Sequence, residues 1–164
     1  MPLASPFTLR SATPGDVPLI LECIRGLAEY ERLPHEVVAT EDVLRETLFG
    51  PRPAAEVVLA HEGEEPAGFA LFFHNYSTFL GRPGLYLEDL FVFPRFRGRG
   101  LGRRLLEHLA KLAVQRGCGR FEWAVLDWNV DAIGFYEALG ARPMSDWTVY
   151  RVSGDALQQL AAGG

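Results

Sequence analysis

A glycine-rich stretch between two regular segments constrains the fold of this chain most. Gly98, Gly100 and Gly102 follow the apolar run Leu85 to Phe93 and precede a run with helical spacing. Glycines let a backbone turn tightly and approach a ligand closely, and the first turn of a helix leaves backbone N–H groups unpaired. These features predict an anion-binding loop at the point where a strand passes into a helix.

Two better-known phosphate loops do not fit this stretch. A Walker loop ends in Gly-Lys-Ser or Gly-Lys-Thr, whereas this one continues Gly102-Arg103-Arg104. Dinucleotide-binding folds use G-x-G-x-x-G, and the spacing here is G-x-G-x-G. A plain glycine-rich turn ahead of an ordinary helix is the alternative that the loop alone leaves open.

Composition bounds the class of protein. A chain of 164 residues can bury about two thirds of its unfolded surface around one core. Its net charge of −5 disfavours nonspecific binding of nucleic acid. Two cysteines make no disulfide framework, no Cys and His cluster has metal spacing, and no apolar run reaches about 18 residues. We therefore expect one domain over residues 1–164, cytoplasmic, with no metal, nucleic acid or membrane partner.

Hydrophobic periodicity and turn residues predict the order of elements. A short strand ends at residues 8–10, and helices start at Thr13 and Thr40. Strands cover 56–61, 67–76 and 85–93, a helix covers 100–116, and a strand starts at Phe121. Asn129 caps a further helix, and a strand over 147–152 precedes a helix over 154–161. This order is that of a mixed α/β domain.

With its arginines, the loop Arg97-Gly98-Arg99-Gly100-Leu101-Gly102 resembles the pyrophosphate signature Q/R-x-x-G-x-G/A of the GCN5-related N-acetyltransferases (GNAT). Residues 24–31, 85–92, 124–129 and 135–141 resemble, in the same order, the diamine or spermidine/spermine N-acetyltransferases. The resemblance implies the GNAT fold, with a mixed, mostly antiparallel sheet of six to seven strands flanked by helices. It also implies acetyl-CoA as co-substrate and a homodimer.

The sequence is more similar to the family members linked to thialysine, S-aminoethyl cysteine, than to the polyamine enzymes. The polyamine enzymes carry an Asp shortly before the Leu-Tyr-Leu-Glu-Asp segment, where this chain reads Tyr76-Ser77-Thr78-Phe79. The shorter link between Ala141 and Trp147 also lacks an acidic residue that polyamine enzymes offer to substrate. Asp146 is the candidate replacement.

Acetyl transfer to an amine needs a neutral amine, a polarised thioester carbonyl and a proton for the thiolate. A primary amine has a pKa of about 10.4, so a carboxylate must attract the cation and take its proton. The resemblance implies that Glu88 does this and that Tyr136 protonates the thiolate. By spacing alone, Tyr136 lies on an apolar helical stripe and would be a core tyrosine. Backbone N–H groups of Leu90 to Val92 are expected to stabilise the carbonyl oxygen.

Glu88 and Asp89 interrupt an apolar strand, which is costly unless they form a site. Neighbouring strand positions face opposite sides, so we expect the two acids to have separate roles. Glu29, Tyr30 and Glu31 are read either as a solvated helix end or as amine-binding residues. Asn129 is read as a helix cap that also lies beside the coenzyme.

The resemblance implies two sets of contacts. Acetyl-CoA is expected to contact Leu90, Phe91, Val92, Arg97, Gly98, Arg99, Gly100, Leu101, Gly102, Arg103, Asn129, Val130, Asp131, Ala132 and Tyr136. The amine is expected to contact Tyr30, Glu31, Ser77, Glu88, Asp89, Glu122, Trp123 and Ala124. The arginines of the loop, with Arg104, are expected to face the phosphates.

The sequence thus predicts an N-acetyltransferase that moves acetyl from acetyl-CoA to a primary amine of a small diamine-like or lysine-like substrate, thialysine or a polyamine. Direct attack in a ternary complex is expected, because neither cysteine lies near the predicted site in sequence. The alternatives are an enzyme of this fold for another amine, such as a protein N-terminus or an aminoglycoside, and a non-catalytic acetyl-CoA sensor.

Overall fold

A computed structural model describes residues 4–163, so residues 1–3 and 164 of the predicted 1–164 domain lie outside the described part. The chain forms two compact units, residues 1–124 and residues 125–164, which are taken separately below.

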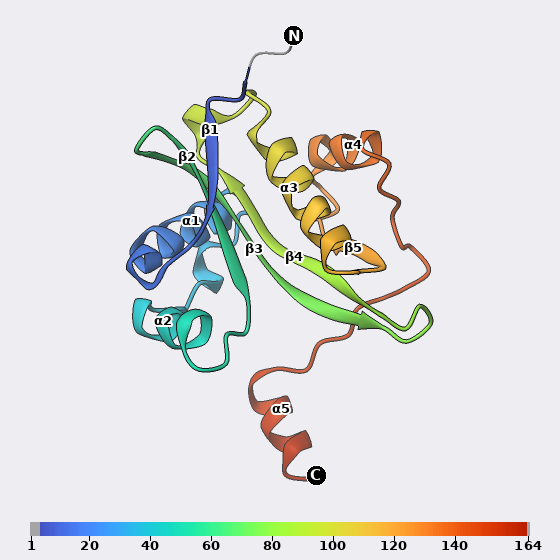
Figure 1. The fold of residues 1–164 in the computed structure, drawn as a ribbon. Helices are drawn as coiled ribbons and strands as arrows, with labels where there is room; N and C mark the ends of the chain where they lie inside the picture. Colours follow the sequence, from blue (N-terminus) through green and yellow to red (C-terminus); the bar gives the residue numbers. More distant parts are fainter. Residues whose placement is uncertain (1–3, 164) are drawn as a thin grey trace. The chain divides into compact units, whose positions relative to one another are not determined.

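The first unit contains a five-stranded sheet (Figure 1). In spatial order its strands are β1 (Phe7–Ser11), β2 (Glu56–Glu62), β3 (Glu65–Ser77), β4 (Arg82–Val92) and β5 (Arg120–Trp123). The first three pairings are antiparallel, and β4 pairs with β5 in parallel. The predicted strands of this unit are confirmed, and β3 and β4 extend further towards their shared turn than the pattern indicated.

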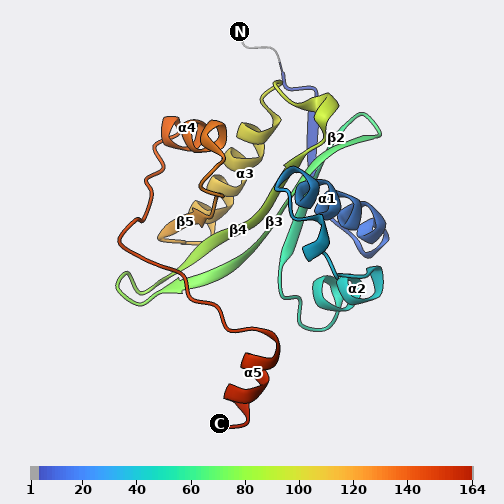
Figure 2. The ribbon, with the colours of Figure 1, turned by 180° about the vertical axis from the view of Figure 1, so that it is seen from behind.

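Helices cover both faces of this sheet. Figures 1 and 2 show α1 (Val17–Tyr30) and α2 (Glu41–Phe49) against one face and α3 (Leu101–Gln115) against the other. In the described chain, three short 3-10 turns each precede a helix: η1 (Pro14–Asp16), η2 (Pro34–Glu36) and η3 (Pro94–Phe96). The predicted start at Thr13 is confirmed, because the Asp16 carboxylate accepts the Thr13 backbone N–H at 2.7 Å. Thr40 caps α2 by accepting the Val43 N–H.

The core on the α1 side is apolar and tightly packed. Buried side chains of α1 and α2 meet buried side chains of the sheet, namely Val17, Ile20, Leu21, Cys23, Leu44, Leu48, Val57, Leu59, Phe69 and Phe91. Gly26 permits this contact, since a Cβ at that position would lie 2.6 Å from the Phe91 ring. A glycine inside a helix lowers its intrinsic stability, so its presence here reflects close approach to the sheet.

The second unit contains α4 (Val130–Ala138) and α5 (Gly154–Ala161). No described residue of this unit is buried. The predicted strand over 147–152 is wrong, because these residues adopt no strand in the described chain, and Trp147, Val149 and Tyr150 are exposed. An alternating pattern makes a strand only when a neighbouring strand supplies the hydrogen-bond ladder. The sheet therefore has five strands rather than six to seven.

Candidate active site

A β-bulge in β4 organises the predicted acidic site. Leu71 of β3 pairs with Asp89, and the next residue, Phe72, pairs with Leu87, so Glu88 is the extra residue of β4. Asp89 thus shares a face with Leu71, which packs against the α1-side core. Glu88 is exposed beside it.

The bulge brings three carboxyl groups under mutual influence. Burial raises the pKa of Asp89 to about 6, with further contributions from Glu88 and Glu31. The pKa of Glu31, just past the end of α1, is also raised, first by burial and then by Glu88. The bulge interrupts the strict alternation that would place Glu88 and Asp89 on opposite faces. Separate roles for the two acids stay a prediction. A cation placed among these acids would favour their charged forms.

The polar face continues from the bulge towards β5. Phe73, Tyr86 and Glu122 are cross-strand partners in one row, and Phe73 lies two residues beyond Leu71 on β3, on the same face. The Phe73 and Tyr86 rings stack at 5.2 Å between centroids. The pKa of Tyr86 is raised by burial, Glu88 and Glu122, so its phenol lies in the field of both carboxylates.

The Glu122 carboxylate has two side-chain partners, and the two residues that follow it do not share its surroundings. Its carboxylate pairs with Arg120 Nε at 2.8 Å and accepts from Asn75 Nδ2 at 3.3 Å. Trp123 pairs with Leu87 and therefore lies on the α3 face, opposite to Glu122. Ala124 follows β5 and is exposed.

The glycine loop has the geometry of an anion cradle. Gly98 and Gly100 have φ of 75° and 82°, conformations that favour glycine, and a Cβ at either position would meet no atom within 4 Å. The first helical hydrogen bond of α3 runs from Arg104 N to Gly100 O, so the preceding amides have no partner within the helix. A pyrophosphate fits such an N-terminus because its charge complements unpaired N–H groups and the helix dipole.

Two of the loop arginines form ion pairs with glutamates of the first unit. Arg99 pairs with Glu62 at 2.7 Å, and Arg103 pairs with Glu107 at 2.8 Å. Both pairs are partly exposed and contribute little stability, so these arginines can share their charge with an anion that the loop amides bind.

Arg97 links the glycine loop to Tyr30, one of the residues predicted to contact the amine. Its Nε donates to Val92 O at 2.9 Å, and its guanidinium carbon lies 5.2 Å from the centroid of the Tyr30 ring and 5.5 Å from that of Phe91. These distances are typical of cation–π contacts. The end of α1 and the start of the glycine loop are thereby in contact through one side chain.

Two further predicted residues of the first unit have local structural contacts. Ser77 is buried, and its hydroxyl accepts the Leu80 N–H at 3.2 Å, which closes the turn between β3 and β4. The pKa of Cys23 is raised to about 12, chiefly by burial, so its thiol stays protonated and is a poor nucleophile.

The second unit carries the predicted thiolate acid. Tyr136 is half-buried on α4, and its ring lies 5.7 Å from that of Phe135. Asn129 caps α4 by accepting the Ala132 N–H, as predicted. Val130 and Asp131 form the first helical turn, and Asp146 is exposed.

Sequence reasoning missed three residues of the polar face: Asn75, Tyr86 and Arg120. Their types carry no motif, and their common face follows only from strand register across the bulge. The one available signal was alternation along β3, which places Asn75 on the same side as Phe73.

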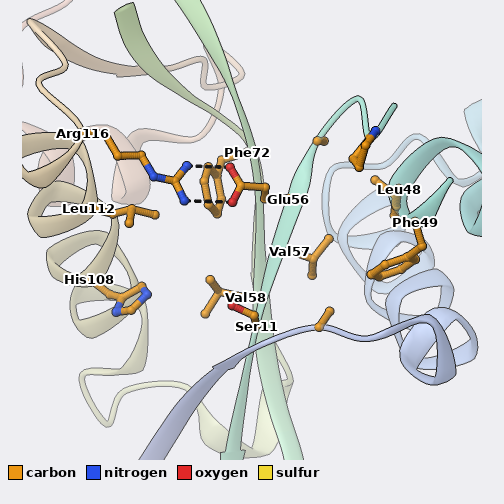
Figure 3. Close-up of a pocket in the computed structure, with 13 residues that line it drawn as sticks. Ser11, Leu48, Phe49, Glu56, Val57, Val58, Phe72, His108, Leu112 and Arg116 are labelled. Atoms are coloured by element: carbon orange, nitrogen blue, oxygen red, sulfur yellow. Dashed lines mark hydrogen bonds and ion pairs between the residues drawn. The ribbon is translucent and has the colours of Figure 1, made fainter. Parts of the chain in front are cut away.

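A cavity of about 400 Å³ lies elsewhere in the first unit, lined by residues of β2, the end of α2 and the second half of α3 (Figure 3). Val58, Phe72 and Leu112 contribute apolar walls, and the Arg116–Glu56 ion pair lies at one side. Its lining residues are none of those predicted for the site.

Within residues 4–163, no group of three or more His, Cys, Asp or Glu side chains is arranged to hold a metal ion. None of the helices in the described chain is long and apolar enough to cross a membrane.

Comparison with known proteins gives one consistent family. The model of the acetyltransferase (GNAT) family matches residues 24–141. A thialysine N-epsilon-acetyltransferase of Sus scrofa is 40% identical over 93% of this chain and 96% of its own. An L-ornithine N5-acetyltransferase of Arabidopsis thaliana is 38% identical, covering 93% of this chain and 86% of its own. Among solved structures, an integron cassette protein from V. cholerae is similar with a TM-score of 0.80 at 26% identity, over 96% of this chain and 99% of its own. The chain belongs to the GNAT acetyltransferase family.

Proposed function

We propose that this protein transfers acetyl from acetyl-CoA to a primary amine of a small lysine-like or diamine-like molecule. One observation carries the proposal: a cluster of three carboxyl groups lies at a bulge in β4, and the same strand leads into the anion-binding loop before α3. The two relatives named above support a side-chain amine of an amino acid as acceptor, because thialysine and ornithine both carry one.

The carboxyl cluster prepares the amine. An alkylammonium is mostly protonated at neutral pH, and Glu31, Glu88 and Asp89 attract it by charge. Glu88, exposed at the bulge, takes the proton directly or through water. Loss of the proton frees the nitrogen lone pair to attack the thioester carbonyl.

Backbone N–H groups of β4 stabilise the oxygen of that carbonyl. The pairing of β5 with β4 covers residues 84–87, so among residues 4–163 no strand pairs with β4 beyond Leu87 on that edge. Amides of Leu90 to Val92 that face this edge are positioned donors for a developing oxyanion. Tyr136 protonates the departing thiolate, since a phenol with a pKa of about 10 can donate to it in the transition state.

We also propose that the two units work as one domain and that the enzyme is a cytoplasmic homodimer. The family match runs across both units, from residue 24 to residue 141. A unit of about 40 residues seldom folds alone without disulfides, metals or a partner, and the second unit has no buried residue among those described.

Release of free coenzyme A tests the proposal, with thialysine, lysine, ornithine, diaminopropane, putrescine and spermidine as acceptors. Wild-type turnover should be fastest with an amino-acid acceptor. Glu88→Gln and Tyr136→Phe should each lower kcat by tenfold or more, because proton transfer of this kind contributes about 10²- to 10⁴-fold. If acetyl-CoA binds but no amine raises the rate above background, the non-catalytic sensor replaces the enzyme.

A further inference from the structure

A second charged cluster lies on the same face of the sheet as the acids of the bulge, nearer to the β3–β4 turn. Asn75, Gly84 and Arg120 are cross-strand partners in the row next to that of Phe73, Tyr86 and Glu122. Arg120 Nη2 donates to Tyr76 O at 3.2 Å, so its side chain crosses β4 to reach β3.

This cluster depends on the missing side chain of residue 84. A Cβ on Gly84 would collide with Asn75 Oδ1 and would lie 3.2 Å from Arg120 Cγ. With glycine there, Asn75 and Arg120 approach from opposite strands; Asn75 donates a hydrogen bond to Glu122, and Arg120 forms an ion pair with it. The three strands thus present one guanidinium and one carboxylate side by side.

The pair is open to a ligand. α1 covers this face around Phe69 and Phe91, and Figure 2 shows the β3–β4 hairpin extending past α1. The Arg120 and Glu122 side chains keep 38% and 34% of their exposure. A partly exposed ion pair contributes little stability, so a ligand can share its two charges at small cost.

The distance to the bulge matches a basic amino acid. Glu122 lies in the row of Phe73, two β3 residues (about 7 Å) beyond the row of Asp89, and one strand (about 4.8 Å) to the side, so the two backbone positions are about 8 Å apart and their carboxylate side chains can reach into that span. An extended lysine side chain separates its terminal nitrogen from the α-carbon by about 6 Å, from ordinary bond lengths. A side-chain ammonium at the bulge would place the α-carbon near Glu122.

We propose that Arg120 and Glu122 form a head-group subsite for a zwitterionic α-amino acid. Arg120 binds the α-carboxylate, Glu122 binds the α-ammonium, and the carboxyl groups of the bulge bind the side-chain ammonium. This inference rests on the proposed function and sharpens its substrate class: a plain diamine offers no anion to Arg120, so it is the poorer acceptor.

Three acceptors that differ by one group test the subsite. Lysine has both head groups, cadaverine lacks the carboxylate, and 6-aminohexanoate lacks the α-ammonium. Wild-type kcat/KM should favour lysine about tenfold over each, the size of one charge-assisted contact in a partly exposed site. Arg120→Gln should abolish the preference over cadaverine, Arg120→Lys should restore part of it, and Glu122→Gln should abolish the preference over 6-aminohexanoate.

Two further variants separate selectivity from stability. Arg116→Gln removes the same charge from the Arg116–Glu56 pair beside the cavity in Figure 3, and should leave both preferences unchanged. Gly84→Ala displaces Asn75 while keeping all charges, and should weaken both preferences. Melting temperatures identify any variant that is merely unfolded.

Equal wild-type turnover of lysine and cadaverine would overturn the subsite while leaving the acetyltransferase activity intact. If no acceptor turns over, the proposed function fails first. Calorimetric binding of lysine and cadaverine to the coenzyme A complex then decides the subsite on its own, and equal affinities reject it.

Discussion

The two ends of β4 differ sharply on the face that α1 packs against. At the loop end, Phe91 is buried under Gly26 in the apolar core, and the Arg97 guanidinium lies over its ring. At the hairpin end, Tyr86 shares its row with Glu122 and is only half-buried. The bulge at Glu88 lies between them. One strand therefore supplies core packing at one end and charged groups at the other, and the bulge marks the boundary.

The comparison teaches why an acidic pair can persist in an apolar strand. Without a bulge, Glu88 and Asp89 would alternate between faces, and one of them would enter the core against α3. Because of the extra residue, Asp89 faces the α1 side of the sheet, whereas Leu87 and Leu90 both face the α3 side. Burying the Asp89 carboxylate still disfavours its charged form, and burial raises its pKa to about 6.

Removing one phenylalanine from each end should give the largest contrast. Phe91→Ala should lower the free energy of unfolding by about 3–5 kcal/mol, because it leaves a cavity under α1. Phe73→Ala, at the half-buried end, should cost about 1 kcal/mol. Urea unfolding of both variants measures the difference, and equal losses would show that the hairpin end is as tightly packed as the core.

Asp89→Asn should stabilise the protein above pH 6. Because the folded pKa of about 6 exceeds the unfolded value of about 3.9, the contribution of Asp89 to stability is fully present below pH 4 and is lost as pH rises to 6. A neutral amide escapes this loss, so the gain should be about 2 kcal/mol at pH 7.5 and near zero at pH 4. A gain of the same size at both pH values would contradict the raised pKa.

Arg97→Gln should affect both substrates, although Arg97 belongs to the glycine loop that we propose binds acetyl-CoA. Its contacts with Tyr30 and Phe91 join that loop to the end of α1, and a cation–π contact at a partly exposed site is worth about 0.5–1 kcal/mol. KM for acetyl-CoA and for the amine should each rise about two- to fivefold.

Arg95→Gln is the matched control for Arg97. Arg95 also stacks on aromatic rings, with its guanidinium carbon 4.9 Å from the centroid of the Phe96 ring, but its carboxylate partner is Glu65 on β3. Neither KM should change in this variant. If Arg97→Gln raises only the KM for acetyl-CoA, the contact between Arg97 and Tyr30 does not affect binding of the amine.

Glu31→Gln should have the smallest effect. Removing one negative charge near Asp89 lowers the pKa of Asp89 towards its ordinary value, by less than burial raises it, because Glu31 is the weakest of its three influences. A carboxyl-carbon NMR titration of Asp89 in both proteins measures the shift. An unchanged pKa would place Glu31 outside the acidic cluster.

Much of the fold follows from local patterns. The caps at Thr40 and Asn129, the glycine loop and the strands of the first unit depend on neighbouring residues, and the structure confirms them. The strand expected over 147–152 is wrong because its pattern specifies only which side chains would be buried, and no described strand pairs with it.

By itself, the sequence determined the α/β order of elements, the glycine loop and the types of side chain present at the site. Local backbone conformation and side-chain chemistry depend on each residue and its neighbours in the chain. Tertiary structure alone decided which charges meet. A single extra residue in β4 changes the face of every residue beyond it, and this shift brings Glu31, Glu88 and Asp89 together. Pairing between strands distant in sequence then places Arg120 and Glu122 beside Asn75, because register across a sheet is set by packing and not by neighbouring residues.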